Sequence, residues 1–353
     1  MEIDGSFGEG GGQILRTCLS LSCVTGAPFR ACNIRARRKK PGLRPQHLLS
    51  VRAAAEVSGA EIAGDDLGSL ELTFNPGPLR PADYLFDVGR LTSSAGSTGL
   101  VFQTVILPLA FAGSGSRVTI RGGTHVEWSP PADYIKHVFL PLATRFSVRA
   151  ELENPKKGYY PIGGGEIEAR VHPSRPPLSP VEVIDRGGLL NVTVSSCVSN
   201  LPLDIAGRQE KRAVERLEAA SIHPEAASFT APSPGRGTYL FILARFESIA
   251  AGFSALGARG KRAEDVADEA TDKFFSYFNR AGALDPHLSD QVAQCMALAK
   301  GRSSFTTTEV TPHLLTNIYV IERFLPVRFS VSGAPGEEGS VSVEGCGYDG
   351  SGP

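Results

Sequence analysis

The stretch QILRTCLSLSCVTGAPFRACNIR, residues 13–35, decides the fold. Its apolar residues recur at helical spacing between Gln13 and Val24, which predicts a helix. Thr25-Gly26 is a typical helix C-terminus, because glycine accepts the left-handed conformation that ends many helices. The segment Phe29–Arg35 that follows is strand-like. The stretch therefore predicts the helix-to-strand unit of an α/β protein.

This order recurs along the chain as helix, strand, second helix and second strand. The first helices of three copies begin near residues 13, 97 and 288, so the second gap, about 190 residues, is more than twice the first gap of about 85. The second gap therefore contains residues that do not belong to the repeats. The remaining predicted elements are Gln46–Val57 and Leu70–Phe74 in the first copy; Thr98–Ala112, Arg117–Arg121, Ala132–Phe146 and Ser147–Leu152 in the second; and Leu288–Ala299, Ser303–Glu309, Pro312–Leu325 and Val327–Val331 in the third.

The extra residues predict an inserted α/β module at about residues 183–280. The repeats would then form one domain from residues 1–182 and 281–335, and the Gly/Ser/Glu-rich residues 336–353 a flexible tail. The alternative is that the spacing is accidental and the chain consists of two unrelated α/β domains. The module's predicted elements are the strands Leu190–Val198 and Tyr239–Phe246 and the helices Arg208–Ala220 and Ala263–Asn279.

Composition places the chain among ordinary globular proteins. It has 353 residues, 41% of them hydrophobic, with 36 Lys+Arg against 37 Asp+Glu. This balance excludes a disordered chain and a wholly basic surface that coats nucleic acid, but it permits a local basic patch. Six cysteines without a CxxC pair fit a reducing compartment. The start of the chain lacks the features of a secretory signal, and no apolar stretch is long enough for a membrane span. We expect a cytoplasmic protein, or a nuclear one in a eukaryote, without membrane contact and with its oligomeric state left open.

Two segments could bind phosphate. The glycine-rich segment Gly5–Gln13 leads into the first helix, where backbone N–H groups can approach an anion, but it could equally be a structural turn. The segment Arg35–Arg44 holds six basic side chains, its two end residues included, and no acid, on a turn that contains Pro41-Gly42. It is either a solvated loop or a chelator of phosphate oxygens at a polyanion end.

The segment Thr311-Pro312-His313 predicts a reactive histidine. Threonine is a good helix N-cap and proline a good first helical residue, which places His313 in the first turn. The helix dipole there disfavours imidazolium and attracts phosphate, so the ring would be neutral and nucleophilic beside a bound anion. The competing interpretation is a hydrogen-bonded surface histidine near a cap.

Some polar and aromatic residues fall where the pattern expects a core. Gln103 lies in an otherwise apolar helix, and Asp290-Gln291 occupy the corresponding helix of the third copy. They either satisfy buried backbone or line a pocket. Tyr134 and Phe253 could stack on a base, although such aromatics are more often core residues.

Taken together, the motifs resemble the RNA 3′-terminal phosphate cyclase family over nearly the whole chain, in order and spacing. The resemblance implies three repeated α/β units, each with two helices on a four-stranded sheet, and a smaller α/β domain inserted before the third. The motifs that carry it are Gly8–Gln13, Arg35–Pro41, Pro45-Gln46-His47, Gly163–Glu166, Ser304–Thr307, Thr311-Pro312-His313 and Thr316-Asn317.

The resemblance implies ATP-dependent conversion of an RNA 3′-phosphate to a 2′,3′-cyclic phosphate. His313 maps onto the histidine that takes AMP from ATP and passes it to the RNA end, and Glu9 onto an acidic residue that could hold Mg²⁺ or Mn²⁺. The residues that map onto the remaining site positions are Arg16, Arg35, Arg38, Arg44, Gln46 and His47 for phosphates and the RNA end, and Gln103, Pro131, Tyr134, Phe253, Asp290 and Gln291 for ATP.

Three other functions compete with this one. A non-catalytic relative that assists ribosomal RNA processing lacks the catalytic histidine, so His313 in its full motif counts against it. An enolpyruvyl-transferase-like enzyme has similar repeats but needs no histidine nucleophile and no inserted domain. A plain RNA-binding module is disfavoured by the net charge of −1.

Overall fold

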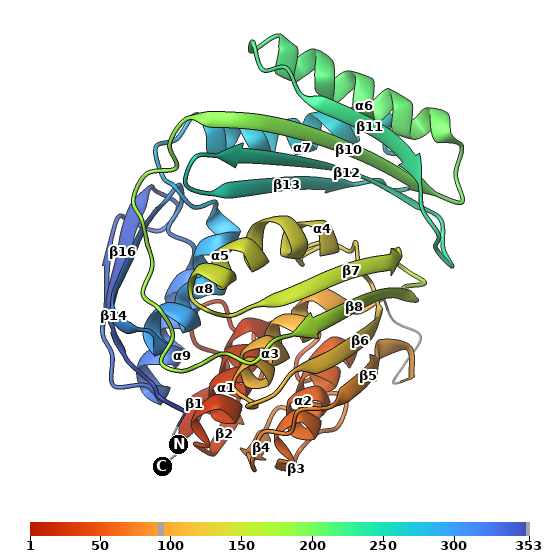
Figure 1. Cartoon of the computed structure of the whole chain (residues 1–353). Helices are drawn as coiled ribbons and strands as arrows, with labels where there is room; N and C mark the ends of the chain where they lie inside the picture. The colour runs from red at the N-terminus through yellow and green to blue at the C-terminus, as the bar shows by residue number, and fades with distance from the viewer. Residues whose placement is uncertain (91–94, 351–353) are drawn as a thin grey trace.

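A computed structural model describes residues 1–90 and 95–350 (Figure 1). Within them lie four four-stranded sheets, each packed against helices, so the predicted α/β fold class is confirmed. The three repeats each build one sheet, and residues 189–278 build the fourth. The domain boundaries at residues 182/183 and 280/281 stay predictions.

The first repeat forms the sheet β1-β2-β4-β3 and the helices α1 and α2. The second repeat forms the sheet β5-β6-β8-β7, the helix α3 and a helical segment from residue 132 to 145 that contains a π-helical stretch. The bounds are β1 (Glu2–Asp4), α1 (Gly12–Thr25), β2 (Phe29–Cys32), α2 (Pro45–Ser58), β3 (Glu61–Ala63), β4 (Leu72–Asn75), β5 (Asp83–Asp87), η1 (Val88–Arg90), α3 (Thr98–Ala110), β6 (Ser116–Gly122), α4 (Ala132–Tyr134), η2 (Ile135–Phe139), α5 (Leu140–Arg145), β7 (Ala150–Lys156) and β8 (Gly165–Val171).

The inserted residues form the sheet β11-β10-β12-β13 with α6 and α7, and the third repeat forms the sheet β15-β16-β14-β9 with α8 and α9. The bounds are β9 (Glu182–Val183), β10 (Leu189–Ser199), α6 (Leu203–Glu218), β11 (Glu225–Thr230), β12 (Gly237–Phe246), β13 (Ala250–Leu256), α7 (Ala263–Phe278), α8 (Pro286–Leu298), β14 (Lys300–Thr307), α9 (Pro312–Phe324), β15 (Phe329–Ser332) and β16 (Gly339–Cys346).

The repeat helices gather at the centre and the three repeat sheets surround them (Figure 1). Helix α1 packs on α2, α3 and α9, and α8 packs on α9, so the helices of different repeats share one core. The inserted sheet lies above this assembly in Figure 1, with α6 and α7 on its face away from the repeats. Its β13 contacts the π-helical segment of the second repeat. The core therefore joins segments that are far apart in sequence.

The expectation of a flexible tail is wrong over residues 339–346. Strand β16 lies inside the third sheet, antiparallel to both β14 and β15, and it buries Val341 and Val343. These valines alternate with polar residues, and this period-two pattern is typical of a half-buried strand. The Gly/Ser/Glu-rich composition of the segment concealed this alternation. Residues 351–353 of the predicted tail lie outside the described residues.

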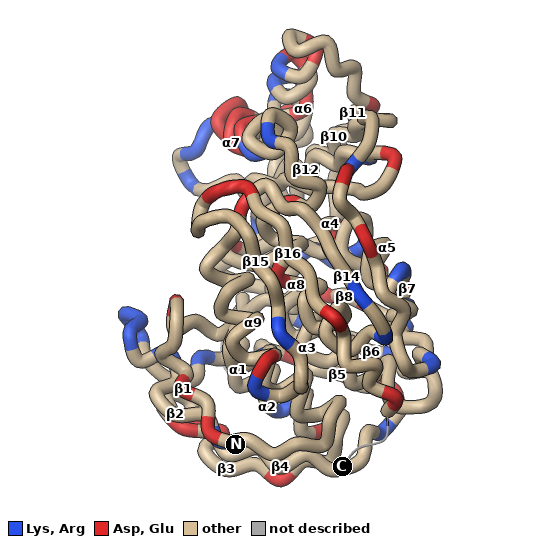
Figure 2. The backbone as a smooth tube through the Cα atoms, turned by 90° about the vertical axis from the view of Figure 1, so that its left-hand side faces the viewer, with Lys and Arg blue, Asp and Glu red and all other residues tan. Residues whose placement is uncertain are grey.

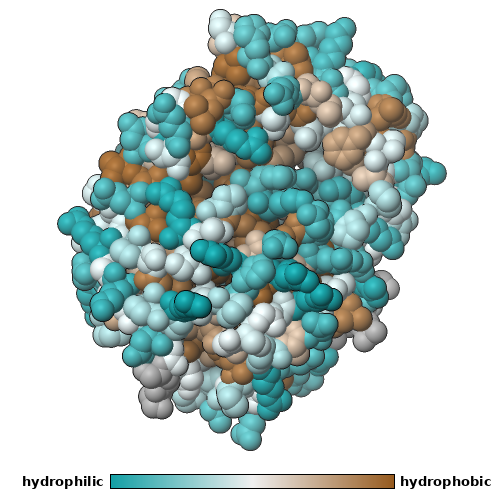
Figure 3. All heavy atoms as spheres, viewed as in Figure 1, coloured by the Kyte–Doolittle hydropathy of each residue, from teal (hydrophilic) through white to brown (hydrophobic). Residues whose placement is uncertain are grey.

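The surface agrees with the balanced composition. Figure 3 shows that hydrophilic residues cover most of the face seen in Figure 1, with hydrophobic residues between them in separate groups. In the described part of the chain, no helix combines the length and apolar character that a membrane span requires.

Candidate active site

The N-terminal ends of the repeat helices contact one another in a series that runs from repeat to repeat. At α1, a Cβ on Gly12 would lie 2.3 Å from Nε2 of His47, in the first turn of α2. Next to His47, the side-chain Oε1 of Gln46 accepts a hydrogen bond of 3.3 Å from the backbone of Ser97, the N-cap of α3. A Cβ on Gly99 in α3 would lie 2.9 Å from the carbonyl oxygen of Pro130, just before α4.

The same chain of contacts continues to the third repeat. The hydroxyl of Tyr134 in α4 donates to both carboxylate oxygens of Asp285, the N-cap of α8, at 2.9 Å. His313 in the first turn of α9 meets Glu9 just before α1. Each helix N-terminus carries about half a positive elementary charge. Several such ends at one place make an anion-attracting surface.

Glu9 is the centre of the contacts around His313. Its Oε2 lies 3.1 Å from Nε2 of His313 and 3.5 Å from a guanidinium nitrogen of Arg38. The His313 side chain remains 45% exposed, so a ligand can reach the ring. Thr311 caps α9 as predicted, because its hydroxyl oxygen accepts a hydrogen bond from the backbone of Leu314 at 3.1 Å.

Burial and nearby cations keep the His313 ring neutral. Burial lowers its pKa from the usual value of 6.5, Glu9 raises it, and Arg16, His287 and Arg38 lower it further. A neutral imidazole has a free nitrogen lone pair, which a nucleophile requires.

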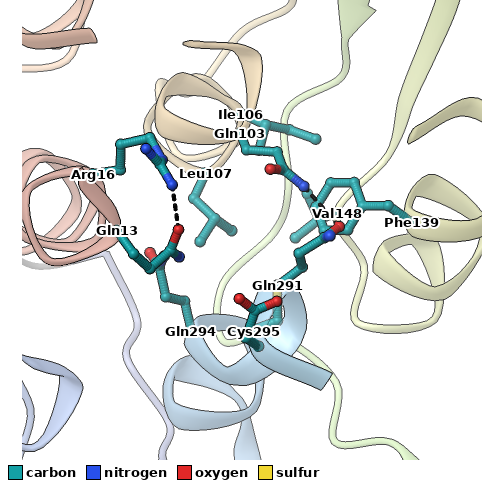
Figure 4. A pocket seen from close by; sticks show the side chains of 11 residues that line it. Gln13, Arg16, Gln103, Ile106, Leu107, Phe139, Val148, Gln291, Gln294 and Cys295 are labelled. Carbon is teal, nitrogen blue, oxygen red and sulfur yellow. Dashed lines mark hydrogen bonds between the residues drawn. The ribbon is translucent and has the colours of Figure 1, made fainter. Parts of the chain in front are cut away.

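Arg16, Gln103, Asp290 and Gln291 line one small cavity between α1, α3 and α8 (Figure 4). Gln103 donates to the side-chain oxygen of Gln291 at 2.7 Å, and Arg16 donates to Gln13. Burial raises the pKa of Asp290 to about 7 although the charge of Arg16 opposes the rise. Burial lowers the pKa of Arg16 to about 10, which leaves this side chain charged at neutral pH. The structure thus brings these four predicted residues together.

Asn317 joins this cavity to the helix that carries His313. Its side-chain nitrogen donates to the backbone oxygen of Asp290 at 2.8 Å, and its side-chain oxygen accepts from Gln13 at 3.1 Å and Thr17 at 2.6 Å. Helices α1, α8 and α9 are therefore held in a defined relative position.

The basic loop after β2 projects beside β1 and β2 (Figure 2). Arg35 stabilises the conformation of this loop, because its guanidinium donates to the carbonyl oxygens of Lys40 and Gly42, both at 2.8 Å. Arg38 faces Glu9 instead. Arg44 is the N-cap of α2, and its backbone N–H donates to Nδ1 of His47 at 3.2 Å.

His47 is buried and neutral. Burial and the charges of Arg16, Arg35 and Arg44 place its pKa well below the usual value of 6.5. Its ring therefore accepts a hydrogen bond at the start of α2 and does not act as a cation for phosphate.

Phe253 does not belong to this site, which corrects the prediction. Its ring is 6% exposed and packs against Phe274 and Tyr277 in the core between the inserted sheet and its helices. A Cβ on the neighbouring Gly252 would lie 2.9 Å from Val138. Because successive residues of a strand point to opposite faces, Gly252 faces the repeats and Phe253 faces away from them.

Tyr134 is also buried, at 3% exposure, and it contacts the site through the hydrogen bond from its hydroxyl to Asp285. Pro131 lies close by, as the N-cap of α4.

His287 and Asp285 are site residues that the sequence analysis missed. His287 follows Asp285-Pro286 in the first turn of α8, and it acts electrostatically on His313 and on Asp285. The order cap, proline, histidine is the same as in Thr311-Pro312-His313. This shared pattern is the feature of the sequence from which His287 could have been predicted as a site residue.

Glu9 fits a divalent metal of the kind that is bound mainly through phosphates. The described residues contain no cluster of three His, Cys, Asp or Glu side chains suited to a metal. Mg²⁺ is commonly held by one or two carboxylates together with substrate phosphates, and the partly exposed Glu9 carboxylate can supply such a ligand.

The fold and the site together define a repeat-built α/β protein whose anion-attracting centre carries a neutral, accessible histidine. Comparison with known proteins specifies the class further. The family model described as RNA 3′-terminal phosphate cyclase matches residues 7–331. The chain belongs to this family.

Relatives cover the chain almost completely. A protein named RNA 3′-terminal phosphate cyclase from Methylococcus capsulatus is 46% identical over 98% of this chain and 96% of its own length. Proteins of the same name from Pyrobaculum neutrophilum and Archaeoglobus fulgidus are 42% and 45% identical, over 99% and 92% of this chain and 99% and 95% of their own lengths. The resemblance recognised in the sequence is confirmed.

Proposed function

We propose that this protein uses ATP to convert the 3′-terminal phosphate of RNA into a 2′,3′-cyclic phosphate through a histidine-AMP intermediate. The observation that carries the proposal is the neutral, accessible ring of His313 at a helix N-terminus, beside Glu9 and within the electrostatic reach of half-buried Arg16. Family membership and the names of the relatives support the substrate.

In the first step, a ring nitrogen of His313 attacks the α-phosphorus of ATP. The bond from this phosphorus to the bridging oxygen breaks, pyrophosphate leaves, and AMP is bonded to the ring. The helix dipole at α9 and the charges of Arg16 and Arg38 stabilise the negative oxygens of the transition state. We assign Gln103, Asp290 and Gln291 to the nucleotide, because they share one cavity beside Arg16.

In the second step, an oxygen of the RNA 3′-phosphate attacks the bound adenylate and the nitrogen–phosphorus bond breaks. In the third step, the adjacent ribose 2′-OH attacks the 3′-phosphorus, AMP leaves and the ring closes. The 2′-OH requirement would make the last step specific for RNA. A divalent metal, Mg²⁺ or Mn²⁺, would offset phosphate charge, and Glu9 is the residue that we propose to hold it.

Self-adenylylation tests the proposal. The purified protein, given α-labelled ATP and a divalent metal, is expected to retain acid-labile, alkali-stable label, and the His313→Ala variant is expected to retain none. His172→Ala is the matched control, because His172 is a partly exposed histidine on the loop after β8, paired with Glu151. Label on His313→Ala equal to that on the wild type would contradict the assignment.

A further inference from the structure

A second groove lies where the inserted residues meet the second repeat. The loop after β7 supplies Tyr160 and Ile162, and the loop between β11 and β12 supplies Pro234 and Arg236. The groove has a volume of about 450 Å³, within the range of about 300–1,000 Å³ typical of ligand sites. Tyr160 is 78% exposed and Ile162 57%, which is unusual for residues of this size.

The walls of this groove are held in place. The backbone N–H of Lys157 donates to the carbonyl oxygen of Pro232 at 2.8 Å, which ties the two loops together. The side-chain nitrogen of Asn200 donates to the carbonyl oxygens of Ser233 and Gly235 at 2.9 and 2.8 Å. Figure 1 shows the loop between β11 and β12 reaching down to the ends of β7 and β8. The exposed groups therefore sit on a fixed support.

The groove lies at the same end of the second repeat as its helix N-termini. The backbone N–H groups of Thr124 and His125 both donate to the carbonyl oxygen of Gly158, at 3.0 Å. These residues belong to the segment that leads to Pro131, the N-cap of α4. Ser97, the N-cap of α3, bridges to Gly123 in the same segment. The groove is thus connected through backbone contacts to the segments that lead into α3 and α4.

The chemistry of the groove matches single-stranded nucleic acid. An exposed aromatic ring offers a face on which any base can stack. Arg236 is exposed and forms no ion pair with any residue of the described ranges, 1–90 and 95–350, so its guanidinium can meet a phosphate. No acidic side chain lines the groove among the described residues.

We propose that this groove binds the body of a single-stranded RNA whose 3′ end lies in the active site. A base stacks on Tyr160, and Arg236 contacts the backbone phosphate beside it. This inference rests on the proposed function, since it extends the same RNA away from the reacting end.

The test compares two substrates of different length. One is a dinucleotide with a 3′-phosphate, which offers almost no RNA beyond the reacting end, and the other is an unstructured RNA of about 12 nucleotides with the same end. For Tyr160→Ala we expect the ratio of the KM for the long RNA to the KM for the dinucleotide to rise about tenfold, from the loss of one stacked base. Arg236→Ala should raise the ratio by roughly fivefold, more at low salt than at high salt.

Two variants serve as controls. Tyr160→Phe keeps the ring and should keep the wild-type ratio. Arg302→Ala removes an exposed arginine of β14 that does not line this groove, and it should also keep the wild-type ratio. The inference is overturned if the KM ratio is unchanged in both Tyr160→Ala and Arg236→Ala, or if the KM rises by the same factor for both substrates. A protein partner would then remain as the occupant of the groove.

The failure of this inference is distinguishable from that of the proposed function. If the wild type takes up no label from ATP, the proposed chemistry fails, and the groove is then tested by binding alone. In that case a fluorescent single-stranded RNA with a 3′-hydroxyl is titrated at low salt, and Tyr160→Ala should weaken its binding about tenfold relative to Tyr160→Phe. Equal binding by the two variants would contradict the groove.

Discussion

At the residue scale, the pairing of Glu9 with His313 controls a protonation state. The carboxylate stabilises imidazolium, while burial and the cations Arg16 and Arg38 oppose it. The net effect is a pKa below the usual value, so the ring stays free to act as a nucleophile at neutral pH.

Glu9→Gln should therefore lower the pKa of His313 further, because the negative charge 3.1 Å from Nε2 is removed. The measurement is a titration of the His313 ring by NMR in the absence of ATP, so that the result does not depend on turnover. Glu2→Gln is the control, since Glu2 pairs with Arg30 on β2 and does not contact His313. A rise in the pKa would show that the carboxylate does not act as described.

Burial of neutral His47 makes stability depend on pH. Its pKa is well below 6.5 in the folded protein, so the unfolded chain binds more protons as the pH falls below 6.5. We expect the free energy of unfolding to fall from pH 7 to pH 5. His47→Gln, which cannot titrate, should lose less over this interval in urea unfolding experiments. Equal pH dependence of the two proteins would contradict the assignment.

At the element scale, the first turns of α1 and α2 are packed without spare room. A Cβ on Gly12 would lie 2.3 Å from His47 Nε2 and 3.0 Å from a guanidinium nitrogen of Arg16. Only glycine permits this approach, and the two side chains it admits are both predicted site residues.

Gly12→Ala should destabilise the protein by about 1–3 kcal/mol, because His47 must move out of a well-packed position. Self-adenylylation should fall as well, since Arg16 is displaced. The free energy of unfolding and the rate of label uptake are the measurements. Gly207→Ala in α6 is the matched control, because a Cβ there meets nothing within 4 Å. Gly12→Ala with wild-type stability and activity would show that the helices can separate at no cost.

For some helices the local sequence is sufficient to predict where they begin and end. Helices α1, α2, α8 and α9 begin and end within two residues of their predicted bounds, because capping residues and apolar spacing act locally. Several strands were not predicted from the sequence, among them the three strands β1, β5 and β9. Each is short and gains its backbone partners only from distant segments. Strand β16 was missed because half of its residues are glycine or serine.

At the scale of the whole molecule, the C-terminal segment closes the fold. Strand β16 lies between β14 and β15, and the hydroxyl of Tyr348 donates to the backbone oxygen of Val24 in α1 at 2.8 Å. The last repeat is thereby connected to the first.

Removal of residues 339–353 should prevent stable folding, because β14 and β15 lose their shared partner and the burial of Val341 and Val343, about 1.5–3 kcal/mol each, is lost. Val341→Ala is the comparison variant and should lower the melting temperature without preventing folding, because it keeps the backbone partners of β14 and β15 and removes only part of the buried side chain. Circular dichroism and thermal unfolding measure both. A cooperative transition at the wild-type temperature in the deletion variant would show that β16 is dispensable.

The repeats, the presence of inserted residues, the position of His313 in a helical first turn and the family could all be predicted from the amino-acid sequence. These depend on local spacing, caps and motifs. Only the tertiary structure decided that His313 meets Glu9, that Arg35 is used by its own loop, that Phe253 lies in a separate core and that residues 339–346 complete a sheet. The reason is physical: these outcomes depend on which distant segments pack together, and the burial and charge that each side chain meets there are absent from its local sequence.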